Sequence, residues 1–291
     1  MRTRFLAGLL FCILTCQAIV PQTLLAQTGR VYDDLSLESE ILGETRKFAV
    51  YLPPDYDASE RSYPVLYLLH GSGDDQSGWV QFGEVLNIAD REINAGRATP
   101  MVIVMPNADE THRGYTNHIS EDFRYEDFFI EELMPHVESE YRIRREKRYR
   151  AVAGLSMGGN GSFIYALRHP DLFASACPLS AYAGPLSKDE LKGRRGGGEA
   201  TEEQIDAHYE KYSILELINN MPDDQRDDVR WYIDCGDDDF LYEGNSLVHI
   251  AMRKRGVPHE YRVRDGGHRW SYWRSALPTV LAFVSDGFHQ N

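Results

Sequence analysis

The feature that most constrains this fold is an apolar strand that leads directly into a serine flanked by glycines. Residues 149–153 form the strand, GLSMG fills positions 154–158, and a helical pattern follows. Side chains two positions before and after a serine at such a strained turn would clash, and Gly154 and Gly158 avoid this. The turn would hold the Ser156 hydroxyl above the carboxyl edge of a sheet, at a helix start that favours negative charge. The pattern predicts a nucleophile; a structural turn with an incidental serine is the alternative.

Strand-like and helix-like stretches alternate along the rest of the chain. The run at 64–69 is apolar throughout, which is typical of a strand buried on both faces. The alternation predicts an α/β fold, with a mostly parallel sheet and helices on both faces. The first two strands, joined by a turn at Gly43 and Glu44, are expected to form an antiparallel edge. Strands are expected at residues 35–42, 47–52, 64–69, 101–105, 149–155, 174–179, 229–235 and 260–264, and helices at 85–95, 125–140, 159–168, 246–255 and 272–288.

The first 26 residues have the layout of a secretion signal. Arg2 and Arg4 precede an apolar run over residues 5–20, and the small residue Ala26 ends the segment. This layout predicts a signal peptide over residues 1–26 and a secreted or periplasmic protein without a membrane span after cleavage. A membrane anchor is the alternative, although the run is shorter than the ~20 residues that a span needs. Lipid attachment at Cys16 is disfavoured, because the residues before it match a lipobox poorly.

Residues 27–291 are expected to form a single domain, although a length of 291 residues also permits two. Residues 182–228 interrupt the alternation with a glycine-rich stretch and an acidic, helix-prone stretch, without a clear strand. This segment is either a surface excursion or a lid-like insertion that contacts the substrate, because long loops in compact domains are often functional.

Charge and cysteine content exclude several functional classes. The chain has 31 Lys and Arg against 45 Asp and Glu, a net charge of −14. Nucleic acids and anionic membrane surfaces are therefore not expected as partners, because they bind clustered positive charge. Beyond the signal, Cys177 and Cys235 both lie in strand-like runs, and two buried free thiols are favoured over a disulfide. Their spacing does not match a metal site, and neither a metal nor an organic cofactor is expected.

An acyl-transfer serine needs a base, and the base needs an acid that orients it, because a hydroxyl is a weak nucleophile at its free pKa. In this fold type the acid and then the histidine follow the serine along the chain. His268 comes after the strand expected at 260–264, and two glycines before it let the chain fold over the active-site edge. Asp239, after the strand expected at 229–235, is the expected acid, with Asp238 as the alternative.

The oxyanion of a tetrahedral intermediate needs two fixed N–H donors. The amide of Met157 is one of them by position. The second is expected in the loop HGSG at residues 70–73, from the amide of Ser72, with Gly71 as the alternative. His70 is expected to fix this loop by hydrogen bonds rather than to take part in catalysis.

Five ordered motifs give the chain a resemblance to the esterase D family of α/β-hydrolases, which includes carbohydrate esterase family 1. They are YLLHGSG at 67–73 with Trp79, RYEDFFIEEL at 124–133, AGLSMGG at 153–159, CGDDDFL at 235–241 and GGHRW at 266–270. The resemblance covers residues 33–288. It implies the α/β-hydrolase fold, a Ser156, Asp239 and His268 triad, and an oxyanion hole from the amides of Ser72 and Met157.

The resemblance also implies an ester substrate. The secreted chains nearest in pattern are feruloyl and acetyl xylan esterases, which predicts a secreted serine esterase acting on carbohydrate-linked esters of plant cell-wall xylan. Aromatic side chains on the edge loops would suit a ferulate ring, with ordinary packing as the alternative for each. These residues are Trp79, Tyr115, Tyr182, Trp270 and Trp273.

Two further hypotheses stay open. The same chemistry would serve another ester, such as a siderophore lactone or a simple acyl ester, or acyl transfer to a sugar. A catalytically silent binding protein is the third hypothesis, and the presence of Ser156, Asp239 and His268 argues against it.

Overall fold

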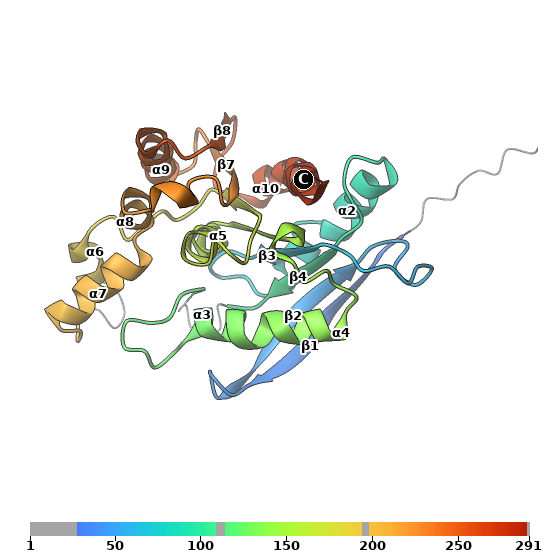
Figure 1. Cartoon of the computed structure of the whole chain (residues 1–291), viewed down its shortest axis with the longest axis horizontal. Coiled ribbons are helices and arrows are strands. Elements are labelled where there is room, and N and C mark those ends of the chain that lie inside the picture. Colours follow the sequence, from blue (N-terminus) through green and yellow to red (C-terminus); the bar gives the residue numbers. More distant parts are fainter. Residues whose placement is uncertain (1–27, 109–113, 194–197, 290–291) are drawn as a thin grey trace, which may run out of the picture.

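Eight strands form one sheet in the computed structural model, which describes residues 28–108, 114–193 and 198–289 (Figure 1). Their order across the sheet is β1-β2-β4-β3-β5-β6-β7-β8. β2 is antiparallel to both β1 and β4, and the other neighbouring strands are parallel, as predicted. The strands are β1 (Arg30–Ser39), β2 (Glu44–Leu52), β3 (Val65–Leu69), β4 (Val102–Pro106), β5 (Arg150–Leu155), β6 (Ser175–Leu179), β7 (Arg230–Gly236) and β8 (His259–Arg264).

The edge hairpin differs from its predicted bounds. β1 begins at Arg30 rather than at residue 35, and β2 begins at Glu44 rather than at residue 47. The pairing register shifts between Tyr32 and Leu35. Most of β1 is exposed or half-buried, so the start of this edge strand carries no apolar pattern by which the sequence would reveal it.

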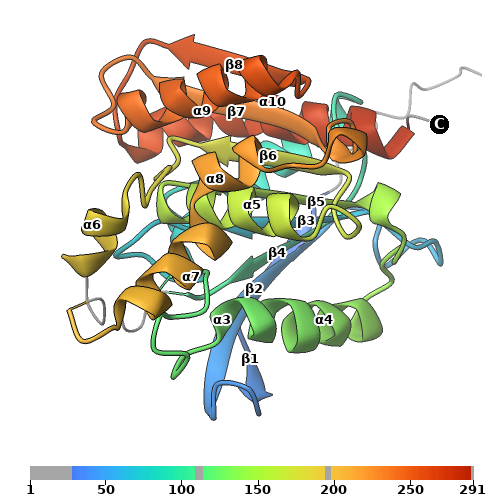
Figure 2. The same cartoon turned by 60° about the vertical axis from the view of Figure 1, so that its left-hand side comes forward.

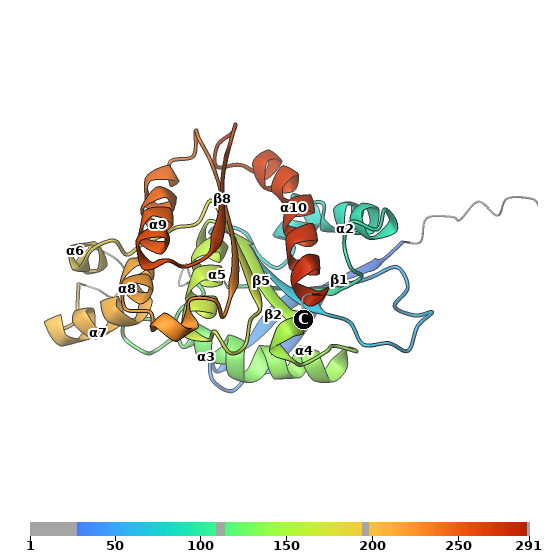
Figure 3. The ribbon, with the colours of Figure 1, turned by 45° about the horizontal axis from the view of Figure 1, so that its top comes forward.

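Helices cover both faces of the sheet (Figure 3). Because alternate side chains of a strand point to opposite faces, Tyr67 and Leu69 of β3 pack in one core, and Leu66 and Leu68 pack in the other. The helices that contribute to the first core are α3 (Tyr125–Asp127), η1 (Phe128–Leu133), α4 (Met134–Glu140), α5 (Met157–Arg168), the end of α7 (Glu202–Tyr212), α8 (Ile214–Asn219) and α9 (Tyr242–Arg255); those that contribute to the second are α1 (Gly78–Gln81), α2 (Val85–Asn94) and α10 (Trp270–His289).

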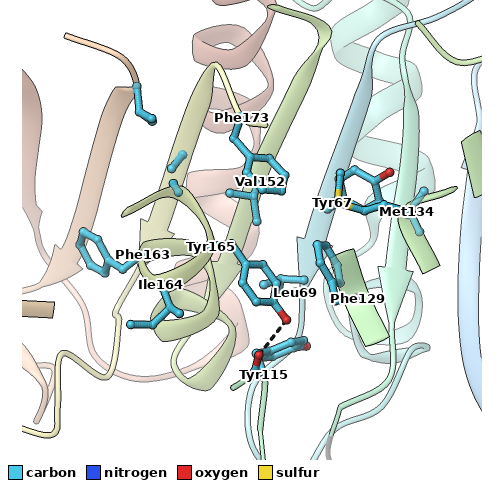
Figure 4. Packing of buried hydrophobic residues seen from close by; sticks show 14 of the residues in the cluster. Tyr67, Leu69, Tyr115, Phe129, Met134, Val152, Phe163, Ile164, Tyr165 and Phe173 are labelled. Atoms are coloured by element: carbon cyan, nitrogen blue, oxygen red, sulfur yellow. Dashed lines mark hydrogen bonds between the residues drawn. The ribbon is translucent and has the colours of Figure 1, made fainter. Parts of the chain in front are cut away.

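The first core joins β3 and β5 to α5 through large aromatic side chains (Figure 4). The rings of Phe129 and Tyr165 stack with their centroids 4.4 Å apart. The hydroxyl of Tyr165 donates a hydrogen bond to the carbonyl of Tyr115, at 2.8 Å. This contact fixes the loop that follows β4 against the helix that follows β5.

The helix predicted over residues 125–140 is present, but its middle is wider than an α-helix. It consists of α3, the π-helical η1 and α4. Pro135 lies in the first turn of α4 and has no N–H to donate to the preceding turn, which accounts for a local change in the hydrogen-bond pattern.

Residues 182–228, called the inserted segment below, combine short helices with irregular chain. α6 (Lys188–Lys192) and α7 (Glu202–Tyr212) lie beyond the sheet, on the side of α3 (Figures 1 and 2). Thr201 and Gln204 form a capping box that begins α7. α8 instead buries Ile214 and Ile218 in the first core, and η3 (Asp223–Gln225) leads to β7. Ala183, near the start of the segment, and Tyr212, at the end of α7, also lie in the first core. The segment is therefore held to the core before α6 and after α7, and its middle lies outside.

Three further expectations concern cysteines, membranes and the N-terminus. Cys177 and Cys235 are buried free thiols, as predicted, and burial raises the pKa of each. No helix in the described part of the chain has both the length and the apolar character that a membrane span requires. The expected signal at residues 1–26, with Cys16, lies outside the described residues.

Candidate active site

Ser156 lies at the sharp turn between β5 and α5. Its backbone has φ 54° and ψ −113°, a conformation that side chains other than glycine rarely adopt. A Cβ on Gly154 would lie 2.5 Å from the carbonyl oxygen of Gly158, and a Cβ on Gly158 would lie 2.5 Å from that of Leu69. Both glycines are therefore required for this turn, for the steric reason that the motif suggested.

The structure brings Ser156, His268 and Asp239 together from three separate loops. The Oγ atom of Ser156 lies 3.0 Å from Nε2 of His268. Nδ1 of the same imidazole lies 2.9 Å and 3.0 Å from the two carboxylate oxygens of Asp239. Ser156 follows β5, Asp239 follows β7 and His268 follows β8, so all three lie at the carboxyl edge of the parallel strands.

Asp239 is the aspartate of the DDD run that contacts the histidine. It is 1% exposed, whereas Asp237 and Asp238 are exposed. Burial disfavours its charge, but hydrogen bonds from His268, from the amide of Leu241 and from Ser180 together hold the pKa of the Asp239 carboxyl below its usual value. Asp239 is therefore ionised at neutral pH and can stabilise a positive charge on the imidazole.

Two aromatic side chains flank the imidazole of His268. Trp273 of α10 packs edge-to-face against it with ring centroids 4.9 Å apart, and its indole N–H donates to the hydroxyl of Ser180 at 3.1 Å. Phe240 lies against it with centroids 4.5 Å apart. Trp273 is 5% exposed and Phe240 is 71% exposed, so one flank of the imidazole is closed by the core and the other is open.

The amides expected to bind the oxyanion belong to Ser72 and Met157. Met157 is the first residue of α5, and the N–H groups of a first helical turn have no acceptor within the helix. Ser72 and Met157 line the same cleft as Ser156. A Cβ on Gly71 would lie 3.5 Å from that of Ser156, which shows how closely this loop approaches the turn.

His70 holds the loop before Ser72 in place. It is 1% exposed. Its Nδ1 lies 2.8 Å from the carbonyl oxygen of Gly71, its Nε2 accepts from the amide of Ala108 at 3.0 Å, and its own amide donates to the hydroxyl of Tyr115 at 2.9 Å. His70 is not part of the cleft lining, and its imidazole packs edge-to-face on the ring of Tyr115 with centroids 5.7 Å apart, which agrees with the loop-fixing role expected for it.

A cleft of about 1060 Å³ opens at Ser156. One wall comes from residues 114–122, in the loop between β4 and α3, and the facing wall comes from the inserted segment. This volume is at the upper end of small-molecule sites, which suits a substrate larger than a simple ester. The inserted segment contributes Tyr182, Gly184, Pro185, Leu191, Glu199, Ala200, Gln204, His208 and Tyr212.

Of the aromatic residues expected at the substrate, Tyr115 and Tyr182 line the cleft and the tryptophans do not. Trp79 is fully buried, and its indole N–H donates to the carbonyl of Leu69 at 3.0 Å. Trp270 packs edge-to-face on Trp79, with ring centroids 5.2 Å apart. This corrects the expectation for Trp79 and Trp270: they form packing contacts beneath the loop after β3.

Several cleft residues were not singled out from the sequence. Asn160 lies one helical turn after Ser156, so helix periodicity alone would have placed it on the same side. It donates to the carbonyls of Tyr182 and Gly184, at 2.9 and 3.1 Å. His208 and Tyr212 belong to the inserted segment, where no sequence pattern distinguishes a cleft residue from a surface residue.

Tyr212 attaches the inserted segment to the body of the protein. Its hydroxyl donates to the buried carboxylate of Glu126 at 2.7 Å and accepts from the amide of Asn117 at 3.3 Å. Burial opposes ionisation of Glu126, but His169, Arg168 and Tyr212 lower the pKa of its carboxyl. Next to Tyr212 on the cleft wall, burial lowers the pKa of His208 to about 4, so this imidazole is neutral at pH 7.

Comparison with known proteins identifies relatives over most of the chain. The family model described as "Putative esterase" matches residues 39–284. An esterase of Mycobacterium tuberculosis is 32% identical over 80% of this chain and 55% of its own length. The endo-1,4-beta-xylanase/feruloyl esterase of Xylanibacter ruminicola is 30% identical over 82% of this chain and 29% of its own length. The chain thus spans about half, or less, of these curated relatives.

A solved structure supports the same relationship. A ferulic acid esterase superposes with a TM-score of 0.79 at 36% sequence identity, and the match covers 89% of this chain and 99% of the other. The sheet order and the helices on its two faces are therefore those of that esterase, over nearly its whole length.

Proposed function

Because the chain belongs to the esterase family and has the α/β-hydrolase fold, we propose that it hydrolyses carboxylic esters through Ser156, His268 and Asp239. The observation that carries this proposal is the continuous hydrogen-bond chain from Oγ of Ser156 through the imidazole of His268 to the carboxylate of Asp239. Each bond has the length that proton transfer or orientation requires.

In the proposed reaction His268 takes the proton of Ser156 as Oγ attacks the ester carbonyl. Asp239 keeps Nδ1 protonated, so Nε2 is free to accept that proton, and it stabilises the imidazolium that forms. The imidazolium then protonates the leaving alcohol as the tetrahedral intermediate collapses to an acyl-enzyme. His268 then takes a proton from a water that attacks the acyl carbonyl and forms a second tetrahedral intermediate. When this intermediate collapses, the bond to Oγ of Ser156 breaks, the acid leaves, and the imidazolium returns its proton to Oγ.

The negative charge of both intermediates would be stabilised by two amides. We assign them to Ser72 and Met157, which line the cleft together with Ser156, and the start of α5 adds its dipole. Removing one such donor typically costs about 3 kcal/mol of transition-state stabilisation. Backbone donors cannot be deleted by a side-chain change, so the oxyanion hole depends on the loop geometry that His70 maintains.

The substrate that we propose is a feruloyl or acetyl ester of a plant cell-wall polysaccharide such as xylan. The similarity to a ferulic acid esterase at 36% identity supports it, as does the similarity to a xylanase/feruloyl esterase at 30%. The size of the cleft and the presence of Tyr182 in its lining suit an aromatic acyl group.

We also propose export from the cell through residues 1–26, because xylan is an extracellular polymer and these residues have the layout of a signal peptide. Sequencing the N-terminus of protein recovered outside the cytoplasm tests this directly. A mature chain that begins near residue 27 is the expected result, and a retained Met1 in a cytosolic fraction contradicts it.

Hydrolysis of a matched substrate panel tests the function. The panel contains methyl ferulate, a feruloylated arabinoxylan oligosaccharide, acetylated xylan and p-nitrophenyl acetate. We expect the feruloyl esters to have the highest kcat/KM. Turnover confined to acetylated xylan would identify a deacetylase instead, and turnover of p-nitrophenyl acetate alone would remove the cell-wall substrate while leaving the proposed triad.

The Ser156→Ala variant controls the chemistry on every substrate of the panel. Its activity is expected to fall at least about 10⁴-fold, because the nucleophile is removed while the fold is kept. Ser246→Ala, at a half-buried serine of α9 outside the cleft, is the matched control and is expected to keep wild-type activity. Unchanged activity in Ser156→Ala would refute the mechanism whichever substrate is cleaved.

A further inference from the structure

Phe240 is unusual because it is both exposed and close to the catalytic imidazole. Its side chain is 71% exposed, which makes it the most exposed large hydrophobic residue in the described part of the chain. Its ring lies 4.5 Å from that of His268, and it lines the cleft together with Leu241. Leaving a phenyl ring in water forgoes about 2 kcal/mol of burial, so this position suggests a ligand that covers it.

The proposed reaction determines which part of a substrate meets this ring. His268 must protonate the leaving alcohol, so the alcohol oxygen lies within hydrogen-bond reach of Nε2, at ~2.6–3.2 Å. Asp239 occupies Nδ1, and Trp273 closes one flank of the imidazole with a side chain that is 5% exposed. Of the two aromatic rings that flank the imidazole, only that of Phe240 is exposed to solvent. The group attached to the alcohol oxygen therefore passes over Phe240.

The exposure of Phe240 also indicates what kind of group this is. A ligand on an open ring has one face against the phenyl group and its other face in water. An aliphatic alcohol would gain little there, because apolar ligands are usually enclosed on most sides. A sugar ring has one face of C–H groups, which the electron-rich face of an aromatic ring attracts, and hydroxyl groups that remain hydrated.

We propose that Phe240 is a specificity-determining residue on which the sugar ring of the alcohol group stacks during hydrolysis. The proposal rests on the ester hydrolysis argued above and adds which side of the substrate the enzyme selects and with which residue. It assigns Phe240 to the alcohol, and it leaves Tyr182 of the cleft lining to the acyl group.

The test compares two esters with the same acyl group and different alcohols. The ratio of kcat/KM for a feruloylated arabinoxylan oligosaccharide to kcat/KM for methyl ferulate is measured in wild type, Phe240→Ala and Phe240→Trp. We expect Phe240→Ala to lower this ratio about tenfold, mainly through a higher KM for the oligosaccharide. Phe240→Trp, which keeps an aromatic face, is expected to preserve or raise the ratio.

A matched control separates this effect from general loss of an exposed apolar side chain. Ile250 is 45% exposed on α9 and does not line the cleft, so Ile250→Ala is expected to keep the wild-type ratio. An equal loss on both esters in Phe240→Ala would mean that the ring only supports His268, and it would overturn the proposal.

The failure of this proposal and of the proposed function can be told apart. If wild type cleaves acetyl but not feruloyl esters, the same ratio is measured for an acetylated xylo-oligosaccharide against ethyl acetate, and the expected tenfold fall is unchanged. If wild type cleaves simple esters and no carbohydrate ester, the stacking role of Phe240 is wrong and the triad stands. If Ser156→Ala retains activity, the mechanism from which the position of the alcohol was deduced is wrong as well.

Discussion

The two sides of the cleft are built in different ways. The reactive side consists of Ser156, Asp239 and His268, each held in a short loop at the end of a parallel strand and joined to one another by hydrogen bonds. The opposite side is the inserted segment, whose α6 and α7 lie beyond the sheet (Figures 1 and 2) and which is anchored by Tyr212. The core of the protein thus fixes the chemistry, whereas a peripheral addition shapes the space for the substrate.

The largest effect is expected on the reactive side, from the acid. In Asp239→Asn the amide cannot hold His268 in the tautomer that accepts a proton from Ser156, and kcat is expected to fall about 10⁴-fold. Asp238→Asn is the matched control, since Asp238 is exposed and does not contact the imidazole. Comparable losses of kcat in both variants would show that the two aspartates share the role of orienting His268, and would contradict its assignment to Asp239 alone.

The second prediction compares a glycine of the turn with a glycine of the inserted segment. Gly158→Ala places a Cβ 2.5 Å from the carbonyl oxygen of Leu69 and 2.6 Å from that of His70, and is expected to cost about 3 kcal/mol of unfolding free energy. In Gly193→Ala the Cβ would lie 3.7 Å from the carbonyl oxygen of Glu190, an ordinary contact distance, so a gain of about 0.5 kcal/mol is expected. Urea denaturation measures both. Equal changes in the free energy of unfolding in the two variants would contradict the expected difference between the tightly packed turn and the inserted segment.

The same contrast explains what could be predicted from sequence. Tight packing leaves few residue choices, so the glycines around Ser156 and the apolar run of β3 carry clear signals, and all eight strands were predicted. Asp239 could be identified because it follows the buried strand β7, and His268 because it follows β8, the last strand of the sheet. The expectation that Trp79 and Trp270 contact the substrate was wrong, because both pack against other residues. An aromatic residue that packs in a core and one that lines a cleft have the same sequence pattern when they lie near the end of a strand.

The wall of the cleft could not be predicted for a physical reason. His208, Tyr212 and Asn117 come together only through long-range packing of α7 against the loop after β4. No periodicity in the sequence connects residues about 90 positions apart. Most of α7 is polar and is exposed or half-buried, so its sequence does not show which of its side chains face the cleft. The chemistry of a member of this family is thus evident locally, whereas its specificity depends on tertiary structure.

Removing the anchor of the inserted segment is expected to have a moderate effect. Tyr212→Phe leaves the amide of Asn117 and the carboxylate of Glu126 each without one hydrogen bond, at a cost of about 1.5 kcal/mol. We expect a raised KM for bulky esters, a nearly unchanged kcat, and faster hydrogen exchange in α7 but not in β5. Tyr209→Phe is the control, because its hydroxyl bond to the carbonyl of Leu186 is exposed. A fall in kcat alone would mean that the wall is part of the reactive side.

The smallest effect concerns pH and is confined to the inserted segment. Burial, reinforced by His118, Lys211 and Arg168, lowers the pKa of His208 to about 4. The unfolded chain takes up a proton there below about pH 6.5, whereas the folded chain does not until about pH 4, so this residue lowers stability as pH falls through that interval. Partial exposure reduces the expected loss between pH 7 and pH 5 to about 1 kcal/mol.

Substituting His208 sharpens this prediction. In His208→Gln the loss of stability between pH 7 and pH 5 is expected to be smaller than in wild type, and hydrogen exchange in α7 should no longer accelerate at pH 5. The lowered pKa of Asp239 keeps that carboxylate ionised at both pH values, so Asp239 itself does not contribute to the change over this interval. His289→Gln, at the end of α10, is expected to behave as wild type. Acceleration in β5 equal to that in α7 would show that the wall and the reactive side unfold together, and the contrast between them would fail.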